Sequence, residues 1–392
     1  MISYLHTSRS IRRLALARLV SVTGSSAATT ALYFLVYERT GAPLWVTVAM
    51  LATIGLHPVA LAGLGGLGDS FDRRWVMIAS DLASALLFSL LILDHPVGIV
   101  VVIAALATLA EAPFLPASAA AIPSLAEQHE LGRANGIVNG AVSVGRMVGP
   151  LIAGGLFTLR GPDLVFAFNA ASFLVSALLV VLLPSRMSSA TPTSRMTSPW
   201  PAISHIRATR PIYLVLISSV MAYVTTSFAM VGEPPLADSF GVGAWGYGIM
   251  MAAWGIGLVI GSLVAAWRLS EATERQGLFA GRVVMGTGMT LVAITPWFPP
   301  IPPLMVVGGS GSGLLLAALY SQVQRHSPDA IRSNVFALFE AVGSAGFVIG
   351  VVSAGLIVQE LGVRPAYLIA GLGTLASAVP LYRNLRVLGG GP

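Results

Sequence analysis

Apolar residues occur in blocks along almost the whole chain, and each block is long enough to cross a bilayer as a helix. A helix needs about 20 residues to span the hydrocarbon core. A β-barrel would need shorter segments of alternating polarity, which this pattern does not show. The pattern therefore predicts an all-α membrane protein with twelve transmembrane helices. Their expected ranges are 12–37, 43–67, 75–94, 97–121, 132–157, 163–184, 211–232, 242–267, 277–297, 302–325, 332–358 and 363–385.

The order of these blocks repeats halfway along the chain. A tandem repeat of about six helices running in the same direction is typical of secondary transporters built from two helix bundles. We therefore predict two pseudo-symmetric six-helix bundles, residues 1–184 and 211–392, joined by a cytoplasmic linker, residues 185–210, rich in Ser, Thr, Pro and Arg. At an offset of 200 residues, Gly41, Trp45, Met50, Ala52 and Gly55 recur as Gly241, Trp245, Met250, Ala252 and Gly255.

Composition narrows the possible chemistry. Hydrophobic residues make up 55% of the chain and charged residues 10%, which is outside the range of soluble globular domains. The chain has neither Cys nor Lys, so disulfides, iron–sulfur clusters, cysteine nucleophiles and P-loop or Schiff-base lysines are excluded. No HExxH or acyl-transfer pattern is present. We expect no metal, no cofactor and no enzymatic activity.

The positive charge is distributed unevenly. All 22 basic residues are Arg, and the net charge is +6. Seventeen of them, with Arg282 counted among these, fall at one set of predicted helix ends, and only Arg39, Arg160 and Arg364 fall at the opposite ends. By the positive-inside rule, both termini are cytoplasmic and the protein lies in the cell membrane. The basic excess then reflects topology and not nucleic-acid binding.

The loop after the second predicted helix reads GGLGDSFDRR over residues 65–74. Glycine permits a tight turn between two close helices, and an ordinary basic loop on the inside is the simpler interpretation. The loop also resembles the signature between helices 2 and 3 of the major facilitator superfamily, which in that family is a conformational latch between the lobes. The resemblance implies the major facilitator fold, with Asp81 and Arg133 as candidate latch partners. Gly65, Asp69, Arg73 and Arg74 match the signature, whereas Ser70 and Asp72 depart from it.

The fifth predicted helix carries small residues at close spacing around Pro150. Such residues permit close helix contact, and tight packing alone would explain them. The run also resembles the antiporter motif of the same superfamily, which is associated with exporters. With residues 114–117 and 133–135, it is similar to the macrolide-efflux and enterobactin-exporter branch. The motif positions are Gly145, Gly149, Pro150 and Gly154.

Polar residues recur on one face of several apolar helices. Arg18, Ser21, Ser25 and Thr29 follow one another at steps of 3, 4 and 4 residues, so they share a helix face. A polar face is costly in hydrocarbon, so these faces are expected to line a common wet cavity, although any single hydroxyl can instead bond to its own backbone. The candidate cavity residues are Ser25, Thr29, Thr108, Tyr223, Thr226, Tyr320, Gln324 and Trp254.

Four charged residues lie well inside predicted helices: Arg18, Glu111, Arg146 and Glu340. Each costs on the order of 3 kcal/mol to insert, so each is a candidate for function. A carboxyl group in a low-dielectric site favours its neutral form and can exchange a proton. Our hypothesis is that Glu111, or else Glu340, carries a coupling proton and that Arg146 tunes it. A static ion pair between Glu111 and Arg146 is the alternative.

Together these patterns predict a monomeric secondary transporter that exports small amphipathic or hydrophobic molecules by alternating access, coupled to proton antiport. Its expected partners are the small-molecule substrate, protons and the lipid bilayer, and not nucleic acid. An uptake carrier, an uncoupled facilitator or a lipid-moving transporter of the same fold remain alternatives.

Overall fold

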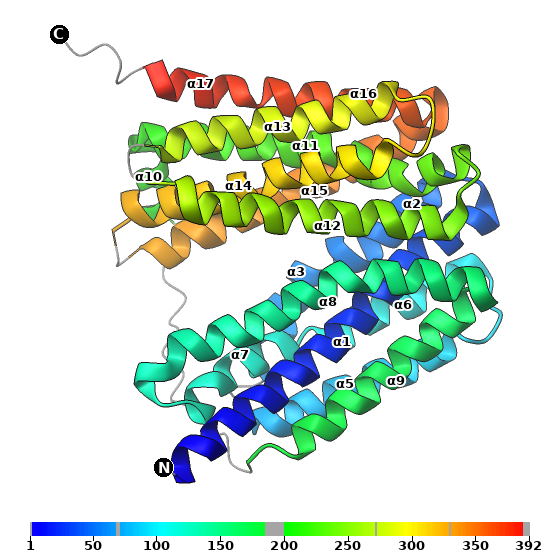
Figure 1. The fold of residues 1–392 in the computed structure, drawn as a ribbon, viewed down its shortest axis with the longest axis vertical. Coiled ribbons are helices and arrows are strands. Elements are labelled where there is room, and N and C mark those ends of the chain that lie inside the picture. The colour runs from blue at the N-terminus through cyan, green and yellow to red at the C-terminus, as the bar shows by residue number, and fades with distance from the viewer. Residues whose placement is uncertain (1, 68–70, 185–199, 271–272, 329–330, 387–392) are drawn as a thin grey trace. The chain divides into compact units, whose positions relative to one another are not determined.

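The computed structural model describes residues 2–67, 71–184, 200–270, 273–328 and 331–386, and all regular elements in these ranges are helices (Figure 1). The chain forms two compact units, which are described separately. Each unit also includes a short segment from the other half of the repeat: Ala42–Thr47 belongs to the second unit and Ala244–Gly248 to the first.

The first unit is built around α1, which packs against α8 and α9 along its length (Figure 1). α5 packs against α6, α7 and α9. Two short connections are not α-helical: a π-helix, Leu51–Gly55, and a 3₁₀ turn, Gln128–Glu130. The α-helices of the first half of the chain, of which α2 lies mostly in the second unit, are α1 (Ile2–Thr40), α2 (Pro43–Met50), α3 (His57–Leu64), α5 (Arg73–Leu90), α6 (Val97–Glu111), α7 (Phe114–Leu125), α8 (Leu131–Arg160) and α9 (Pro162–Val181).

The second unit repeats this plan. α11 packs against α15 and α16, and α13 packs against α14 and α16 (Figure 1). One helix, α10, lies within the predicted linker, and its Ala202 and Ile206 are buried in the core of this unit. The helices are α10 (Trp200–Ala208), α11 (Arg210–Ser239), α12 (Gly243–Arg268), α13 (Glu274–Ile294), α14 (Ile301–His326), α15 (Arg332–Leu361), α16 (Val363–Ala376) and α17 (Ala378–Arg386).

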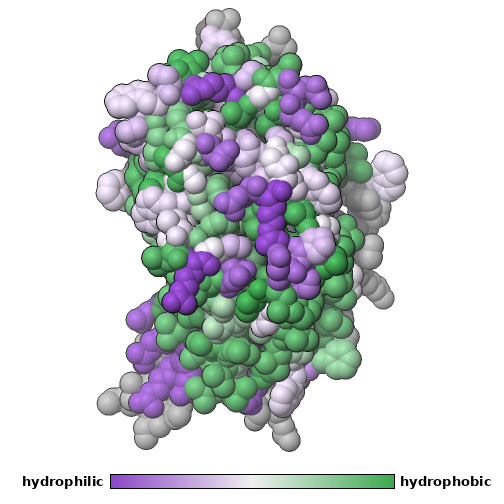
Figure 2. All heavy atoms as spheres, turned by 90° about the vertical axis from the view of Figure 1, so that its right-hand side faces the viewer, coloured by the Kyte–Doolittle hydropathy of each residue, from purple (hydrophilic) through white to green (hydrophobic). Residues whose placement is uncertain are grey.

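Eleven helical stretches within the described residues are long and apolar enough to cross a membrane. The third predicted helix, α5, is not among them, because Arg73, Arg74 and Asp81 place three charges within its 18 residues. On the face shown in Figure 2, hydrophobic side chains reach the surface over much of the visible area. Leu86, Leu178 and Ile349 are each at least 60% exposed. A helical protein with such an apolar surface is suited to contact with lipid.

Two helices that we predicted as continuous are interrupted. The second predicted helix consists of α2, the π-helix and α3, and the fourth is divided into α6 and α7. Pro58 and Pro113 lie at these interruptions. Proline lacks an N–H donor and clashes with the preceding turn, so each interruption has a local cause. Irregular backbone inside a membrane protein is tolerated where other protein groups or a water-filled cavity supply hydrogen bonds to its N–H and C=O groups.

Glycines of α14 allow it to pack closely against helices on two sides. A Cβ atom at Gly309 or Gly313 would collide with the backbone of α12 at Trp254 or Leu258, and one at Gly311 would collide with the backbone of α13 at Met285. Close approach of helix backbones is the usual role of such small-residue runs in membranes. The run is therefore a helix-packing element.

Candidate functional site

Glu111 lies at the interruption between α6 and α7. It is the last residue of α6, and Pro113 precedes the first residue of α7. Ser25 of α1 donates a hydrogen bond to its carboxylate, with Oγ 3.0 Å from Oε2. The Ala110 carbonyl, next to the interruption, accepts a hydrogen bond from Ser80 Oγ at 2.5 Å. Side chains of α1 and α5 thus satisfy the polar groups where the helix is broken.

Arg18 and Asp81 extend this polar region into the interior of the first unit. Arg18 is 8% exposed, and its guanidinium lies over the ring of Phe114, 5.7 Å from the ring centroid. Asp81 on α5 is 0% exposed, and Arg18, Ser176 and Glu111 are the polar side chains that act on it. Neither carboxylate oxygen of Asp81 accepts a hydrogen bond from any described residue. Asp81 lies two turns inside α5, and its expected role as a latch partner stays a prediction.

Glu111 and Arg146 do not form an ion pair in the described part of the chain. Arg146 is exposed on α8, and its carbonyl oxygen accepts a hydrogen bond from Ser26 Oγ at 3.3 Å. The carboxylate of Glu111 is instead bound by Ser25. The static pair that we considered is thus not formed, and a tuning role for Arg146 stays a prediction.

The π-helix holds a second polar contact in the first unit. The hydroxyl groups of Tyr33 on α1 and Thr53 in the π-helix lie 2.7 Å apart. Thr53 Oγ1 also lies 2.8 Å from the Ala49 carbonyl oxygen. π-Helical segments are rare and often occur at functional sites. This contact ties α1 to the irregular part of the second predicted helix.

The second unit contains a buried arginine, Arg282, which we had expected at a helix end. It lies two turns inside α13 and is 5% exposed. Its Nε donates to Ser218 Oγ at 3.3 Å and its Nη2 donates to Ser219 Oγ at 3.5 Å. Glu340 is exposed on α15 and acts electrostatically on Tyr223 and Tyr320. The expectation that Arg282 lies at a helix end is therefore wrong.

The remaining cavity candidates have different environments. Thr108 and Thr226 bond to carbonyl oxygens of their own helices, Ala104 at 3.0 Å and Ala222 at 2.7 Å. Thr29 is half-buried and Gln324 is exposed. Tyr223 and Tyr320 are 39% and 44% exposed, and Tyr320 packs against Phe336. Trp254 is half-buried and packs against Gly308 of α14.

The latch-like motif forms the start of α5. Arg73 is buried and its Nη1 donates to the Ala120 carbonyl at 3.0 Å, whereas Arg74 Nη2 donates to the Val181 carbonyl. Asp72, which departs from the family signature, caps α5 by accepting a hydrogen bond from the Arg74 N–H at 2.9 Å. Gly65 ends α3, and Asp69 lies outside the described residues. The two arginines therefore tie α5 to α7 and α9.

The antiporter-like motif packs α8 tightly. A Cβ atom at Gly149 would lie 2.6 Å from Ser26 Cβ and 2.7 Å from the Thr23 carbonyl oxygen of α1. Gly145 also faces α1, and Pro150 is buried within α8. Gly154 lies against the first turn of α12, in the segment that belongs to this unit. Close packing thus accounts for these four positions, and a transport role stays a prediction.

Sequence reasoning missed Asp81, Arg282 and Glu233 as buried charges. Glu233 lies inside α11 and is 8% exposed. The predicted helix ended at residue 232, yet α11 continues through Pro234 and Pro235 to Ser239. A register search could have found Glu233, since it follows Ser219 and Thr226 at steps of seven residues.

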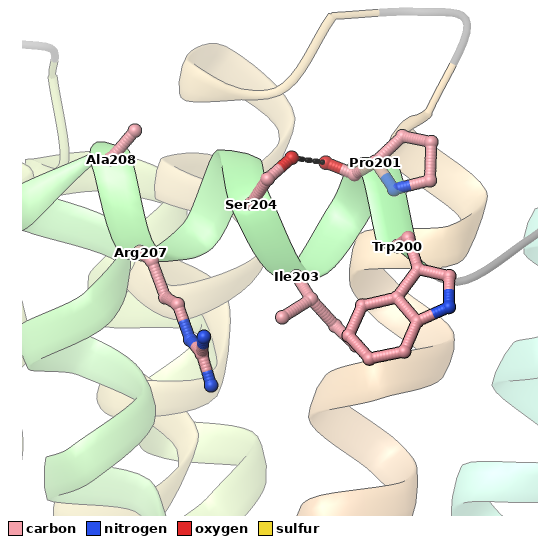
Figure 3. A pocket seen from close by; sticks show the side chains of 6 residues that line it. All are labelled: Trp200, Pro201, Ile203, Ser204, Arg207 and Ala208. Carbon is pink, nitrogen blue, oxygen red and sulfur yellow. Dashed lines mark hydrogen bonds between the residues drawn. The ribbon is translucent and has the colours of Figure 1, made fainter.

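A surface pocket lies elsewhere, along α10 (Figure 3). Its lining combines an exposed aromatic ring with a basic side chain, and Ser204 Oγ donates to the Pro201 carbonyl at 3.0 Å. Tryptophan and arginine together are typical of a helix at a membrane–water interface. The lining residues are Trp200, Pro201, Ile203, Ser204, Arg207 and Ala208.

Similarity to known proteins agrees with this architecture. The chain is 26% identical over 393 residues to the multidrug efflux pump Tap of Mycolicibacterium fortuitum, with 94% of this chain and 95% of the relative covered. It is 22% identical over 390 residues to macrolide efflux protein A of Streptococcus pyogenes, with the same coverage. A crystal structure of the nucleoside transporter NupG superimposes with a TM-score of 0.75 at 15% identity, covering 96% of this chain and 99% of that one.

The fold and these relatives define a multi-pass membrane transporter of the major facilitator superfamily. A family profile described as transmembrane secretion effector matches residues 6–388, and the chain belongs to that family. The predicted all-α membrane fold and the expectation of a transporter, not an enzyme, are thereby confirmed. Membership of this transporter family implies that the protein interacts with a small-molecule substrate and with the lipid bilayer.

Proposed function

We propose that this transporter exports small amphipathic or hydrophobic molecules from the cytoplasm in exchange for protons, by alternating access, as a monomer with both termini cytoplasmic. The observation that carries the proposal is Glu111 at the interruption between α6 and α7, held by Ser25. A carboxylate at a broken membrane helix is a recurrent ion-coupling element in transporters. The names of two relatives, a multidrug efflux pump and a macrolide efflux protein, support export of such molecules.

The surroundings of Glu111 suit proton exchange. Its carboxylate has a hydroxyl partner and no arginine in ion-pair contact within the described residues. A carboxylate locked to an arginine would resist protonation, whereas one held by a hydroxyl can accept a proton and keep its hydrogen bond. Moving one proton inward releases about 2.3 kcal/mol per 100 mV of membrane potential. That free energy is enough to maintain a concentration ratio of roughly 50 for a neutral substrate across the membrane.

The test uses purified protein in proteoliposomes with a pH gradient and two probes, ethidium and erythromycin. Glu111→Gln should lose gradient-driven accumulation at least about tenfold, and should keep exchange of labelled for unlabelled probe, because coupling and binding are then separated. The matched control is Glu360→Gln, an exposed carboxylate on α15. Undiminished gradient-driven transport by Glu111→Gln would remove Glu111 from this role.

The same vesicles distinguish the alternatives. Exchange without any response to a proton gradient in the wild-type protein would indicate an uncoupled facilitator. Accumulation in the direction of proton entry would indicate an uptake carrier. Movement of fluorescent phospholipids between leaflets, with no transport of either probe, would indicate a lipid-moving transporter.

A further inference from the structure

Glu233 is a buried carboxyl group that the proposed site does not use. It lies in α11 within the segment Val231–Ala237, all of which is buried, and its side chain is 8% exposed. Within the described residues it forms no hydrogen bond and no ion pair, and no charged side chain acts on it. An ionised carboxylate in such surroundings is costly. A bound proton or another cation would remove that cost.

Glu233 continues the polar face predicted for this helix. Ser219, Tyr223, Thr226, Met230 and Glu233 follow one another at steps of 4, 3, 4 and 3 residues, so they share one face of α11. Tyr223 on this face is 39% exposed. Unlike Asp81, which is 0% exposed, Glu233 keeps a small accessible surface.

The backbone beside Glu233 adds oxygen atoms. Pro234 and Pro235 have no N–H, so the carbonyl oxygens of Met230 and Val231 have no helical donor four residues ahead. Carbonyls released in this way are used by transporters to stabilise cations in the membrane. The neighbouring surface of α16 is formed by Val363 and Tyr367, which pack against Gly232.

The repeat shows how the two halves differ at this point. At the offset of 200 residues, Tyr33 corresponds to Glu233 and Thr53 corresponds to Ala253. In the first unit, Tyr33 and Thr53 form a neutral hydroxyl pair at 2.7 Å. In the second half an acid replaces the tyrosine and a methyl group replaces the hydroxyl partner. The second half thus has a carboxyl group at this position and no hydroxyl group at the position of its partner.

We propose that Glu233 is a second proton-carrying carboxyl group, so that each cycle exchanges two protons, one at Glu111 and one at Glu233, for one substrate molecule. This inference rests on the proposed antiport function. On one side of the membrane each carboxylate binds a proton, and on the other side each carboxyl group releases it, so that no bond other than O–H forms or breaks.

The test is the substrate gradient at equilibrium. Proteoliposomes are held at a pH difference of one unit with the membrane potential clamped to zero, and ethidium is the probe. Two protons per cycle sustain a gradient of ~100-fold, and one proton sustains ~10-fold, because one pH unit corresponds to a tenfold ratio per proton. We expect ~100-fold for the wild-type protein and ~10-fold for Glu233→Gln. Asp238→Asn, an exposed carboxylate further along α11, is the matched control and should keep ~100-fold.

A wild-type gradient in Glu233→Gln would overturn the proposal, and so would a gradient of only ~10-fold in the wild-type protein. Glu111→Gln is measured in parallel. If Glu111→Gln keeps the full gradient while Glu233→Gln loses a factor of ten, the role of Glu111 fails and that of Glu233 stands.

Infrared spectroscopy gives a readout that does not depend on transport. Protonated carboxyl groups absorb in a carbonyl-stretching region that ionised ones leave empty. pH-difference spectra of the purified protein should contain a band that Glu233→Gln removes and Asp238→Asn keeps. If Glu233→Gln does not fold, Glu233→Asp is used, and it should shift the band while retaining transport. A band that stays unchanged in Glu233→Gln or in Glu233→Asp would overturn the proposal.

Discussion

At the level of single residues, Asp72 shows how a departure from a family signature can have a local structural reason. It is the N-cap of α5 and accepts a hydrogen bond from the Arg74 N–H at 2.9 Å. Asp72→Ala should lower the stability of the protein by about 1 kcal/mol, because the first turn of α5 loses its cap. Asp72→Asn should be nearly neutral, since Asn caps equally well. Thermal unfolding of both variants in detergent checks this, and equal melting temperatures would contradict it.

Arg18 permits a second prediction at this level. Its guanidinium lies over the Phe114 ring and close to Asp81, with no ion pair formed within the described residues. Phe114→Leu keeps an apolar side chain but removes the aromatic face, which should destabilise the first unit by about 1–2 kcal/mol. Phe88→Leu is the control for loss of an aromatic side chain, because Phe88 stacks on Phe173 and has no cation–π contact with any described residue. If the two variants lose equal stability, the cation contributes nothing at Phe114.

The sequence indicated some of the polar interior and missed the rest for identifiable reasons. Glu111 was predictable because it interrupts a long apolar run. Arg282 was misplaced because an arginine eight residues into a helix can belong either to its end or to its interior, and only the packing of Ser218 and Ser219 against it decides. Asp81 was expected only as a candidate latch partner, because its burial among α5, α7 and α9 is a tertiary property that the sequence pattern does not show.

At the level of helices, the apolar blocks predicted where the membrane-spanning helices lie but not where two of them are interrupted. α6 and α7 are both apolar, so hydropathy does not separate them, and the interruption depends on Pro113 together with a partner for the freed Ala110 carbonyl. Likewise, the predicted helix ended at residue 232, just before Pro234 and Pro235, but packing of their turn in the interior keeps α11 helical to Ser239. Local breaking signals are therefore overridden or confirmed by the neighbouring helices.

The packing of α1 on α8 can be tested at Gly149. A methyl group there would meet Ser26 and the Thr23 carbonyl of α1, so Gly149→Ala should lower stability by about 1–3 kcal/mol through overpacking. Gly140 lies on the same helix with open space where its Cβ would be. Gly140→Ala should be neutral or stabilise the protein by up to about 1 kcal/mol, because alanine favours the helix. Unfolding measurements that rank the two variants in the opposite order would refute the close contact.

At the level of the whole molecule, the repeat preserves the helix plan and changes the chemistry. α1 packs on α8 and α9 in the first unit as α11 packs on α15 and α16 in the second. The buried polar residues at corresponding positions of the two halves differ in chemical type. Asp81 corresponds to Arg282 at an offset of 201 residues, and Tyr33 corresponds to Glu233 at an offset of 200. Helix packing needs only small and apolar residues at the contacts, whereas ionisable groups are free to differ between the halves. The scaffold was therefore predictable from the repeat, and the positions of its charges were not.

The orientation of the chain in the membrane gives the last prediction. Arginines gather at the helix ends that include the N-terminus of α1, and the opposite ends hold few. Of those few, Arg39 is paired with Asp94 at 3.0 Å, and Arg364 donates to the Thr295 carbonyl at 2.7 Å and lies over the ring of Phe240. The difference in the number of arginines between the two sets of helix ends is the asymmetry that sets topology.

Because the chain has no cysteine, single cysteine substitutions can report this orientation without background labelling. Asp94→Cys, at a side chain 90% exposed between α5 and α6, should react with a membrane-impermeant maleimide in intact cells. Ser204→Cys, on the exposed side of α10, should react only after the cells are permeabilised, since α10 follows the basic helix ends. The reverse labelling pattern would invert the topology and with it the direction of the proposed proton-driven export.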